Sequence, residues 1–415
     1  MLGRNVAGVL TLSVVSGGVL SAGSGSTSDG TVVLRGPQAS VSAVAIRVDA
    51  DGVVIRWPDR APATQVLPLS AVRSVGAVEQ GSWADVSDTA EALWRAMSRL
   101  DRGDAVMAEP ILERLFATYR MRTGPTTRVV AEGLLRCRLS RQAHASAIEP
   151  WIVYLGSSSE TGDAAEREAA EIGPSTTLNS RSLRLFAALP PIWGAGPATR
   201  ALAESDARDD LPEGFLPAAR GLRSLYATAA AFEIDGVERE VPLSSGGDPV
   251  LGLVREIVGS RVGPAATRAT ARDMLRRRLG QEGPQWLHAW CRAAIARSLL
   301  REPEIEDQRR AIVELVSVHA FHGTDSPFLA GLALAEAARA CEAIGDRAAA
   351  DAIRGELLER YPGHPSGPGL RAGQGTTADV GADGRDRAIE EPPKTDDLPP
   401  EEGTEPAPGA GEGGG

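Results

Sequence analysis

Residues 331–364 read GLALAEAARACEAIGDRAAADAIRGELLERYPGH, and this stretch decides the fold. Small and apolar residues recur there at the spacing of one helix face, on both sides of a break at Gly345-Asp346. They are Leu334, Ala337 and Ala338 before the break and Leu357 after it. Glycine commonly ends a helix and aspartate commonly begins one. The stretch therefore predicts two helices joined by a tight turn.

This predicted hairpin resembles a tetratricopeptide repeat. The positions that match the spacing of that family are Leu334, Ala337, Ala338, Gly345, Asp346, Ala350, Leu357, Tyr361 and Pro362. The stretch departs from the family pattern where Arg354 replaces the usual aromatic residue and Cys341 the usual tyrosine, so it is a degenerate copy. The resemblance implies stacked helix pairs with a concave protein-binding surface, whereas the spacing alone predicts helical hairpins only.

Further units of this kind are expected in two ranges, 87–156 and 248–364. The first range matches the same offsets at Gly103-Asp104, with Arg120 where the family has proline. In the second, Trp286–His322 is a looser copy that precedes the clear one. We therefore predict a mainly α protein built as a solenoid of degenerate tetratricopeptide-like hairpins.

Residues 30–78 have an apolar period of two and many β-branched residues, which indicates strands. The predicted strands are Thr31–Arg35, Val41–Val48, Val53–Trp57 and Ala63–Leu67. Ala50-Asp51-Gly52 is a turn signal. The pattern resembles the small SH3-like or Sm-like barrels at the front of exported bacterial proteins. Because Trp57 is the one aromatic residue in this range, we expect a protein-contact or structural module and not an RNA-binding one.

Residues 157–247 interrupt the repeats and are expected to form an irregular insert. The segment Leu183–Gly196 indicates extended chain, and Ala218–Phe232 has a helical pattern. Phe232–Val241 predicts a β-hairpin about Asp235-Gly236. An extended segment between helical hairpins is either a spacer or a binding loop, and we favour the spacer.

The two ends of the chain carry different signals. Arg4, the uncharged run Val6–Leu20 and the small residues after it predict that residues 1–23 are a secretory signal, with a retained membrane anchor as the alternative. Residues 365–415 hold eleven acidic and four basic residues among Gly and Pro, which predicts a disordered acidic tail. We therefore expect a protein of the periplasm or cell envelope, with no membrane span in the mature chain.

Composition excludes several chemistries. The formal net charge of the 415 residues is −11, which argues against a nucleic-acid partner. Lys394 is the only lysine and lies in the predicted tail. P-loop proteins, protein kinases and pyridoxal enzymes all need a lysine at the reactive centre, so the sequence predicts none of them and no cofactor. Cys137, Cys291 and Cys341 are odd in number and widely spaced, which implies no disulfide framework.

One group of residues has the composition of a metal site. His288 and Cys291 lie on one predicted helix, and His319 and His322 lie on or just past the next. If the two helices are antiparallel, these four side chains converge as zinc ligands. A packed aromatic corner with hydrogen-bonded histidines is the competing interpretation.

The predicted function is that of a non-catalytic protein–protein interaction scaffold, exported to the periplasm or cell envelope. Its partner would be a protein or peptide held against a groove of small and aromatic residues. The alternative is a metal-binding protein or metal-dependent enzyme that uses the histidine and cysteine group. A cytoplasmic assembly factor is a third possibility if residues 1–23 are retained.

Overall fold

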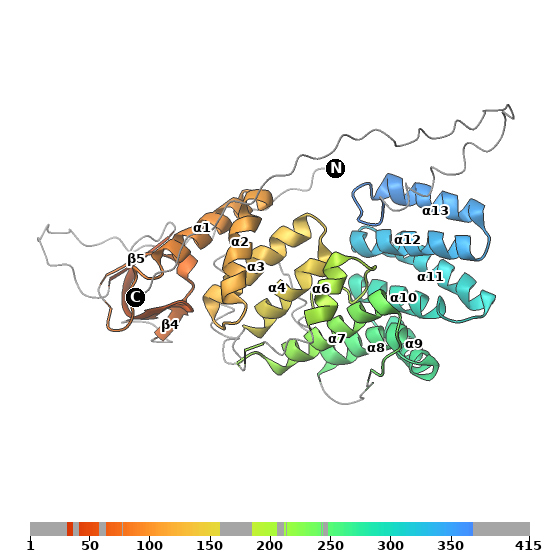
Figure 1. Cartoon of the computed structure of the whole chain (residues 1–415), viewed down its shortest axis with the longest axis horizontal. Coiled ribbons are helices and arrows are strands. Elements are labelled where there is room, and N and C mark those ends of the chain that lie inside the picture. Colours follow the sequence, from red (N-terminus) through yellow and green to blue (C-terminus); the bar gives the residue numbers. More distant parts are fainter. Residues whose placement is uncertain are drawn as a thin grey trace, which may run out of the picture. The chain divides into compact units, whose positions relative to one another are not determined.

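The computed structural model describes residues 31–35, 41–57, 64–76, 78–157, 185–205, 211–212, 214–241, 243 and 248–367. These ranges are mostly helical, with one small antiparallel sheet (Figure 1). The predicted signal segment lies outside them, and so does the predicted tail beyond Gly367. Among the helices in these ranges, none combines the length and the hydropathy that a membrane span requires.

All four strands expected in residues 30–78 are present, and a fifth follows them. The strands are β1 (Thr31–Leu34), β2 (Val41–Asp49), β3 (Gly52–Arg56), β4 (Thr64–Leu67) and β5 (Val72–Val75). They pair antiparallel in the order β4, β3, β2, β1, β5. The β2–β3 turn is tied by Asp49, whose Oδ1 accepts hydrogen bonds from the amides of Asp51 and Gly52. Val53, paired with Val48 on one side and Leu67 on the other, is fully buried.

The sheet packs against the first helices. Val86 and Ala90, at the beginning of α1 (Ser87–Asp101), share a core with buried strand residues such as Ile55. The buried amide of Leu69 donates to Oγ1 of Thr126 in α3 (Pro125–Ser140) over 3.1 Å. The small β module is therefore joined to the helical part by an apolar contact and by a specific buried hydrogen bond.

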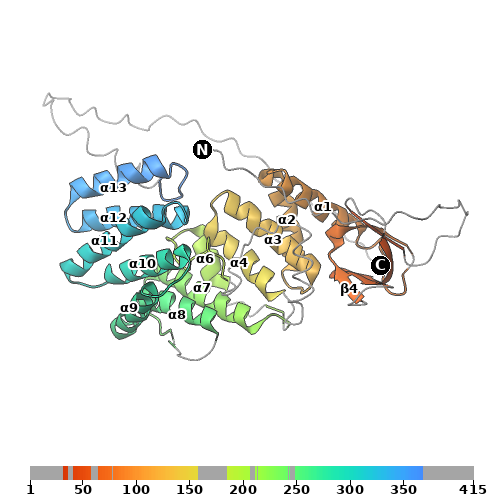
Figure 2. The ribbon, with the colours of Figure 1, turned by 180° about the vertical axis from the view of Figure 1, so that it is seen from behind.

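The helical part follows the chain from α1 to α13 (Figure 1). Besides α1 and α3, the helices are α2 (Ala105–Tyr119), α4 (His144–Gly156), α6 (Pro197–Ser205), α7 (Pro217–Asp235), α8 (Pro249–Val262), α9 (Ala265–Leu279), α10 (Gln285–Leu299), α11 (Ile305–His322), α12 (Pro327–Ala343) and α13 (Arg347–Arg360). Helices that follow one another pack side by side in most cases, and α4 also packs on α6 and α7, as both views show (Figure 2).

The turn chemistry expected from the sequence is present in two hairpins. Gly103 and Gly345 adopt positive φ angles of 82° and 86° between the paired helices. Asp104 and Asp346 come next and cap α2 and α13, because each side chain accepts a hydrogen bond from an amide in the first turn. The predicted helical hairpins around these two turns are confirmed.

The insert of residues 157–247 differs from the prediction. Its described residues contain two helices, α6 and α7, where one was expected. The predicted β-hairpin over Phe232–Val241 is wrong. The helix α7 continues to Asp235, Gly236 ends it at a φ of 68°, and the residues through Val241 form no strand. Asp-Gly favours a positive φ angle at glycine, which suits a helix end as well as a hairpin turn.

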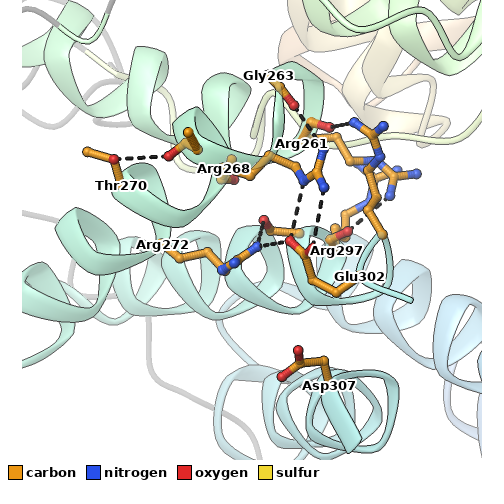
Figure 3. Close-up of polar contacts among 12 residues, drawn as sticks. Arg261, Gly263, Arg268, Thr270, Arg272, Arg297, Glu302 and Asp307 are labelled. Atoms are coloured by element: carbon orange, nitrogen blue, oxygen red, sulfur yellow. Dashed lines mark hydrogen bonds and ion pairs between the residues drawn. The ribbon is translucent and has the colours of Figure 1, made fainter. Parts of the chain in front are cut away.

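Buried ion pairs connect several of the helices between α7 and α12. Figure 3 shows Arg268 and Arg272 converging on the carboxylate of Glu302. Nearby, Arg297 is 3% exposed and binds two glutamates from other helices. A guanidinium in such a place persists only when carboxylates and carbonyls satisfy it, so these pairs fix the arrangement of the helices that supply them.

Candidate functional site

An irregular segment, Leu185–Trp193, which contains a turn closed by the hydrogen bond from the Leu189 amide to the Phe186 carbonyl, lies inside the helical part and not on its surface. Leu185 and Leu189 are fully buried, and Ile192 is nearly so. They belong to one core with residues of α4, α7 and α10. The interpretation of this stretch as a spacer is therefore wrong. Burying several large apolar side chains stabilises the fold by roughly 2 kcal/mol for each, which a spacer would not contribute.

Side chains from three helices hold the backbone of this segment. Four of its carbonyl oxygens accept a hydrogen bond from a buried or half-buried side chain. The pairs are Trp290 Nε1 to Ala187 at 3.1 Å, His144 Nδ1 to Ala188 at 2.8 Å, Tyr226 Oη to Leu189 at 2.6 Å and an Arg297 terminal nitrogen to Trp193 at 3.1 Å. A buried irregular segment has no helix or sheet to pair these carbonyl oxygens, so the side-chain donors satisfy them.

A cavity of about 850 Å³ opens next to the end of this segment. The turn before α4, the beginning of α6, one side of α12 and the residues after α13 enclose it. We refer to it as the α4–α12 cavity. Its main side chains are Arg141, His144, Trp193, Phe328, Arg339 and His364. Its volume lies in the range of sites that hold small ligands or short peptide segments.

Aromatic rings form one wall of the α4–α12 cavity. The rings of His144 and Phe328 are stacked, with centroids 3.6 Å apart. His364 lies on the other side of Phe328 at 5.4 Å and donates from Nε2 to the Phe328 carbonyl. Nδ1 of His364 accepts from the amide of Ser366. This wall joins α4, α12 and the stretch after α13 through stacking and hydrogen bonds together.

Burial keeps both histidines of this wall uncharged at neutral pH. Loss of solvent lowers the pKa of His144 to about 4, although its bond to the Ala188 carbonyl acts in the opposite direction. Burial also lowers the pKa of His364. The positive charge of the cavity at neutral pH therefore comes from its arginines.

Two arginines lie at the cavity, and only one of them has a carboxylate partner within the described residues. The guanidinium of Arg141 binds both carboxylate oxygens of Glu109 outside the cavity, at 2.8 to 3.0 Å. Arg339 is exposed, and its Nε donates to the Ala335 carbonyl one turn earlier in α12. Among the described residues that line the cavity, none carries a carboxylate. The lining is therefore a mixture of apolar, aromatic and neutral polar side chains with a net positive charge.

The four expected zinc ligands do not converge. Among the described parts of the chain, no three His, Cys, Asp or Glu side chains lie together as a metal site would need. His319 faces α13, where Nδ1 is 3.0 Å from the Tyr361 hydroxyl and Nε2 is 3.2 Å from a Glu356 oxygen. The interpretation of these residues as a metal centre is therefore wrong, and His319 connects α11 to α13 instead.

The cysteine among the other three expected ligands lies in surroundings that do not suit zinc. Cys291 is fully buried, and burial raises the pKa of its thiol to about 12, which opposes the thiolate that zinc needs. Its charged neighbours are Arg278 and Glu256 of α9 and α8, on the side away from α11. His288 donates from Nε2 to the Gln281 carbonyl, 3.2 Å away, and His322 is buried at the end of α11, where burial, Arg292 and His288 lower its pKa.

The sequence pattern did not reveal the α4–α12 cavity. Its side chains come from the α3–α4 turn, the insert, α12 and the stretch after α13, and no motif joins these places. A signal for the buried segment was present, because Leu185, Phe186, Leu189, Ile192 and Trp193 are too apolar for a solvent-exposed spacer. A signal for the cavity itself would require knowing how the helices pack.

No family model, no curated protein and no solved structure matches the chain. The geometry of the α4–α12 cavity is therefore the basis for the functional argument that follows.

Proposed function

We propose that this chain is a non-catalytic interaction protein that binds a peptide segment of a protein partner in the α4–α12 cavity. In this proposal the helical hairpins are a degenerate tetratricopeptide-like solenoid, and the N-terminal sheet is a small SH3-like or Sm-like module beside it. The observation that carries the proposal is the cavity of about 850 Å³ with an aromatic wall and a positively charged rim.

The buried segment excludes one possible binding site for a partner, the space between α4, α7 and α10. Leu185–Trp193 fills the space between α4, α7 and α10 and is part of their core. A partner would have to displace several fully buried side chains to enter there, at a cost of many kcal/mol. The α4–α12 cavity adjoins the segment and remains open, so we place the binding surface there.

The polar groups at the cavity support binding and not chemistry. The hydroxyls of Ser146 and Thr199 donate to the backbone carbonyls of Ala143 and Gly194, and neither is bonded to a histidine. Both nitrogens of His364 are engaged with backbone groups. A nucleophile activated by a base requires a hydroxyl and an imidazole in direct contact, and the described lining offers no such pair.

A site-specific photo-crosslink tests the binding surface. Ala195 lies on the rim and is exposed, so a benzoylphenylalanine at that position reaches into the cavity without removing an arginine. The control places the same residue at Val106, which is 80% exposed on α2. We expect one discrete adduct in the native cell extract from position 195 and none from position 106. Equal labelling from both positions would contradict the proposal.

The export of the chain is a separate proposal and has its own test. It rests on Arg4, the uncharged run after it and the small residues that end near residue 23. Mass spectrometry of the mature N-terminus in a fractionated cell is the measurement. A chain that begins near residue 23 in the envelope fraction is the expected result, and a full-length chain in the cytoplasmic fraction would contradict it.

A further inference from the structure

We infer that the segment which the α4–α12 cavity accepts is acidic, with an Asp or Glu side chain beside an apolar one. The inference rests on the proposed function, because it names the chemistry of the partner segment for the same site. It starts from the charge of the lining, which contains Arg141 and Arg339 and, among the described residues, no carboxylate.

Arg339 is the group best placed to bind an incoming carboxylate. Its Nε donates to the Ala335 carbonyl at 3.2 Å, which fixes the side chain along α12. No ion pair within the described residues involves its terminal nitrogens. An arginine fork held at Nε still presents its terminal N–H groups, which match the two oxygens of a carboxylate.

Arg339 differs from three arginines of the helical part that each have a carboxylate partner. Arg268 and Arg272 face Glu302 at ion-pair distance, as the close-up of this region illustrates (Figure 3), and Arg297 faces Glu336 in the same way. Arg141 at the same cavity is held by Glu109. An arginine that lines a cavity without a carboxylate partner can bind a carboxylate that a ligand supplies.

The beginning of α4 adds positive potential to the same cavity. Ala143 precedes α4 and caps it with no side chain, whereas α2 and α13 are capped by Asp104 and Asp346. First-turn amides have no acceptor within their own helix, and His144 and Ser146 of this turn line the cavity. This potential strengthens the preference for an anion that the arginines establish.

The apolar groups beside Arg339 define the second part of the expected ligand. Phe328 and Leu332 lie on α12 on the same side of the cavity as Arg339, and His144 is uncharged at neutral pH. An apolar side chain next to the acidic one would pack against these groups and lose contact with water. A basic segment would instead meet Arg339 and the α4 terminus as like charges.

Selection from a random library tests the inference with a defined probe. The full chain is immobilised and a phage library of random dodecapeptides is selected against it. Synthetic copies of the enriched peptides are then measured against three variants. Arg339→Glu reverses the charge at the cavity, Arg309→Glu makes the same change on the exposed outer side of α11, and Ala198→Trp fills the cavity.

The expected result is enrichment of acidic peptides whose affinity falls about 10- to 100-fold with Arg339→Glu, the loss expected for a charge-assisted contact, and stays the same with Arg309→Glu. Enriched peptides without acidic residues that still lose binding with Ala198→Trp would overturn this inference and leave the proposed function standing. Peptides that bind all three variants equally would overturn the proposed function as well.

Discussion

The Nε atom of Arg297 lies 3.0 Å from Oε2 of Glu336, and both side chains are less than a tenth exposed. The same guanidinium binds Glu233 of α7 at 3.1 Å and the carbonyl of Trp193 at 3.1 Å. One side chain of α10 therefore joins α7, α12 and the buried segment. Because Trp193 and α12 both line the α4–α12 cavity, Arg297 holds together two of the walls that form it.

Replacing Arg297 is expected to destabilise the protein strongly. Arg297→Leu removes the ion-pair partner of buried Glu336 and leaves Glu233 with Arg261 alone, and the loss of one member of such a group costs about 3–5 kcal/mol. The matched control is Arg309→Leu, in an exposed pair with Glu306, where the expected cost is below about 1 kcal/mol. Urea denaturation of both variants measures the difference. Equal losses in the two variants would show that Arg297 is not a structural hub.

The cost of Arg297→Leu is also expected to depend on pH. Burial by itself raises the pKa of Glu233, but Arg297 and Arg261 outweigh burial and hold it below its usual value. A lowered carboxyl pKa contributes stability above the unfolded pKa of about 4.3, and this contribution is lost as the pH falls through the folded value. The gap in unfolding free energy between wild type and variant should therefore be largest near pH 7 and shrink below about pH 4. A gap that is constant with pH would contradict this account.

A second pH dependence comes from His144. Its folded pKa of about 4 lies below the unfolded value of about 6.5, so the unfolded chain binds the proton more tightly. The stability of the wild type should then decrease as the pH falls from about 6.5 to about 4, by about 3 kcal/mol from this residue. His144→Gln keeps a donor for the Ala188 carbonyl and removes the titration. We expect a shallower pH profile for this variant in thermal unfolding, and parallel profiles would disprove the assignment.

The sequence predicted well wherever local chemistry decides structure. In residues 30–78 apolar and polar residues alternate, and this pattern fits a strand with one face buried. The turns at Gly103-Asp104 and Gly345-Asp346 need a positive φ angle followed by a helix cap, and few other residue pairs supply both. These strands and turns could be predicted because the residues that determine each of them are close together in the sequence.

The predictions that failed depend on packing between distant elements. Asp235-Gly236 suits a helix end and a hairpin turn equally, and the choice follows from α7 having a core to pack against, so the helix continues to Asp235. Cys291 and His319 lie on neighbouring helices, but each side chain faces a third helix, which the spacing along the chain does not reveal. The α4–α12 cavity has the same origin, since its walls meet only after α12 packs near α4.

One buried hydroxyl contributes to the contact between the β module and the helices. Thr126 is fully buried, and its Oγ1 accepts the hydrogen bond from the amide of Leu69. Thr126→Val keeps the shape but leaves this buried amide without an acceptor, at a cost of about 1–3 kcal/mol. Thr126→Ser retains the hydroxyl and is expected to lose less. Urea denaturation compares the two variants, and an equal loss would mean that the methyl group and not the hydrogen bond stabilises the contact.

Two glycines in neighbouring helices should respond with opposite sign to the same substitution. Alanine favours a helix over glycine by about 1 kcal/mol. At Gly355 in α13 an added Cβ meets nothing within 4 Å, so Gly355→Ala should raise stability by about 0.5–1 kcal/mol.

At Gly331 in α12 the added Cβ would lie 2.5 Å from Cδ2 of His364, and the imidazole is held in place by its bonds to Phe328 and Ser366. Overpacking of this kind costs about 1–3 kcal/mol, so Gly331→Ala should be destabilising despite its better helix propensity. Thermal unfolding of the two variants gives the signs directly. Because His364 lines the cavity, Gly331→Ala should also weaken the peptides selected on the full chain, whereas Gly355→Ala should leave their affinity unchanged. Stabilisation by both substitutions would mean that His364 moves freely and that the aromatic wall of the cavity is not rigid.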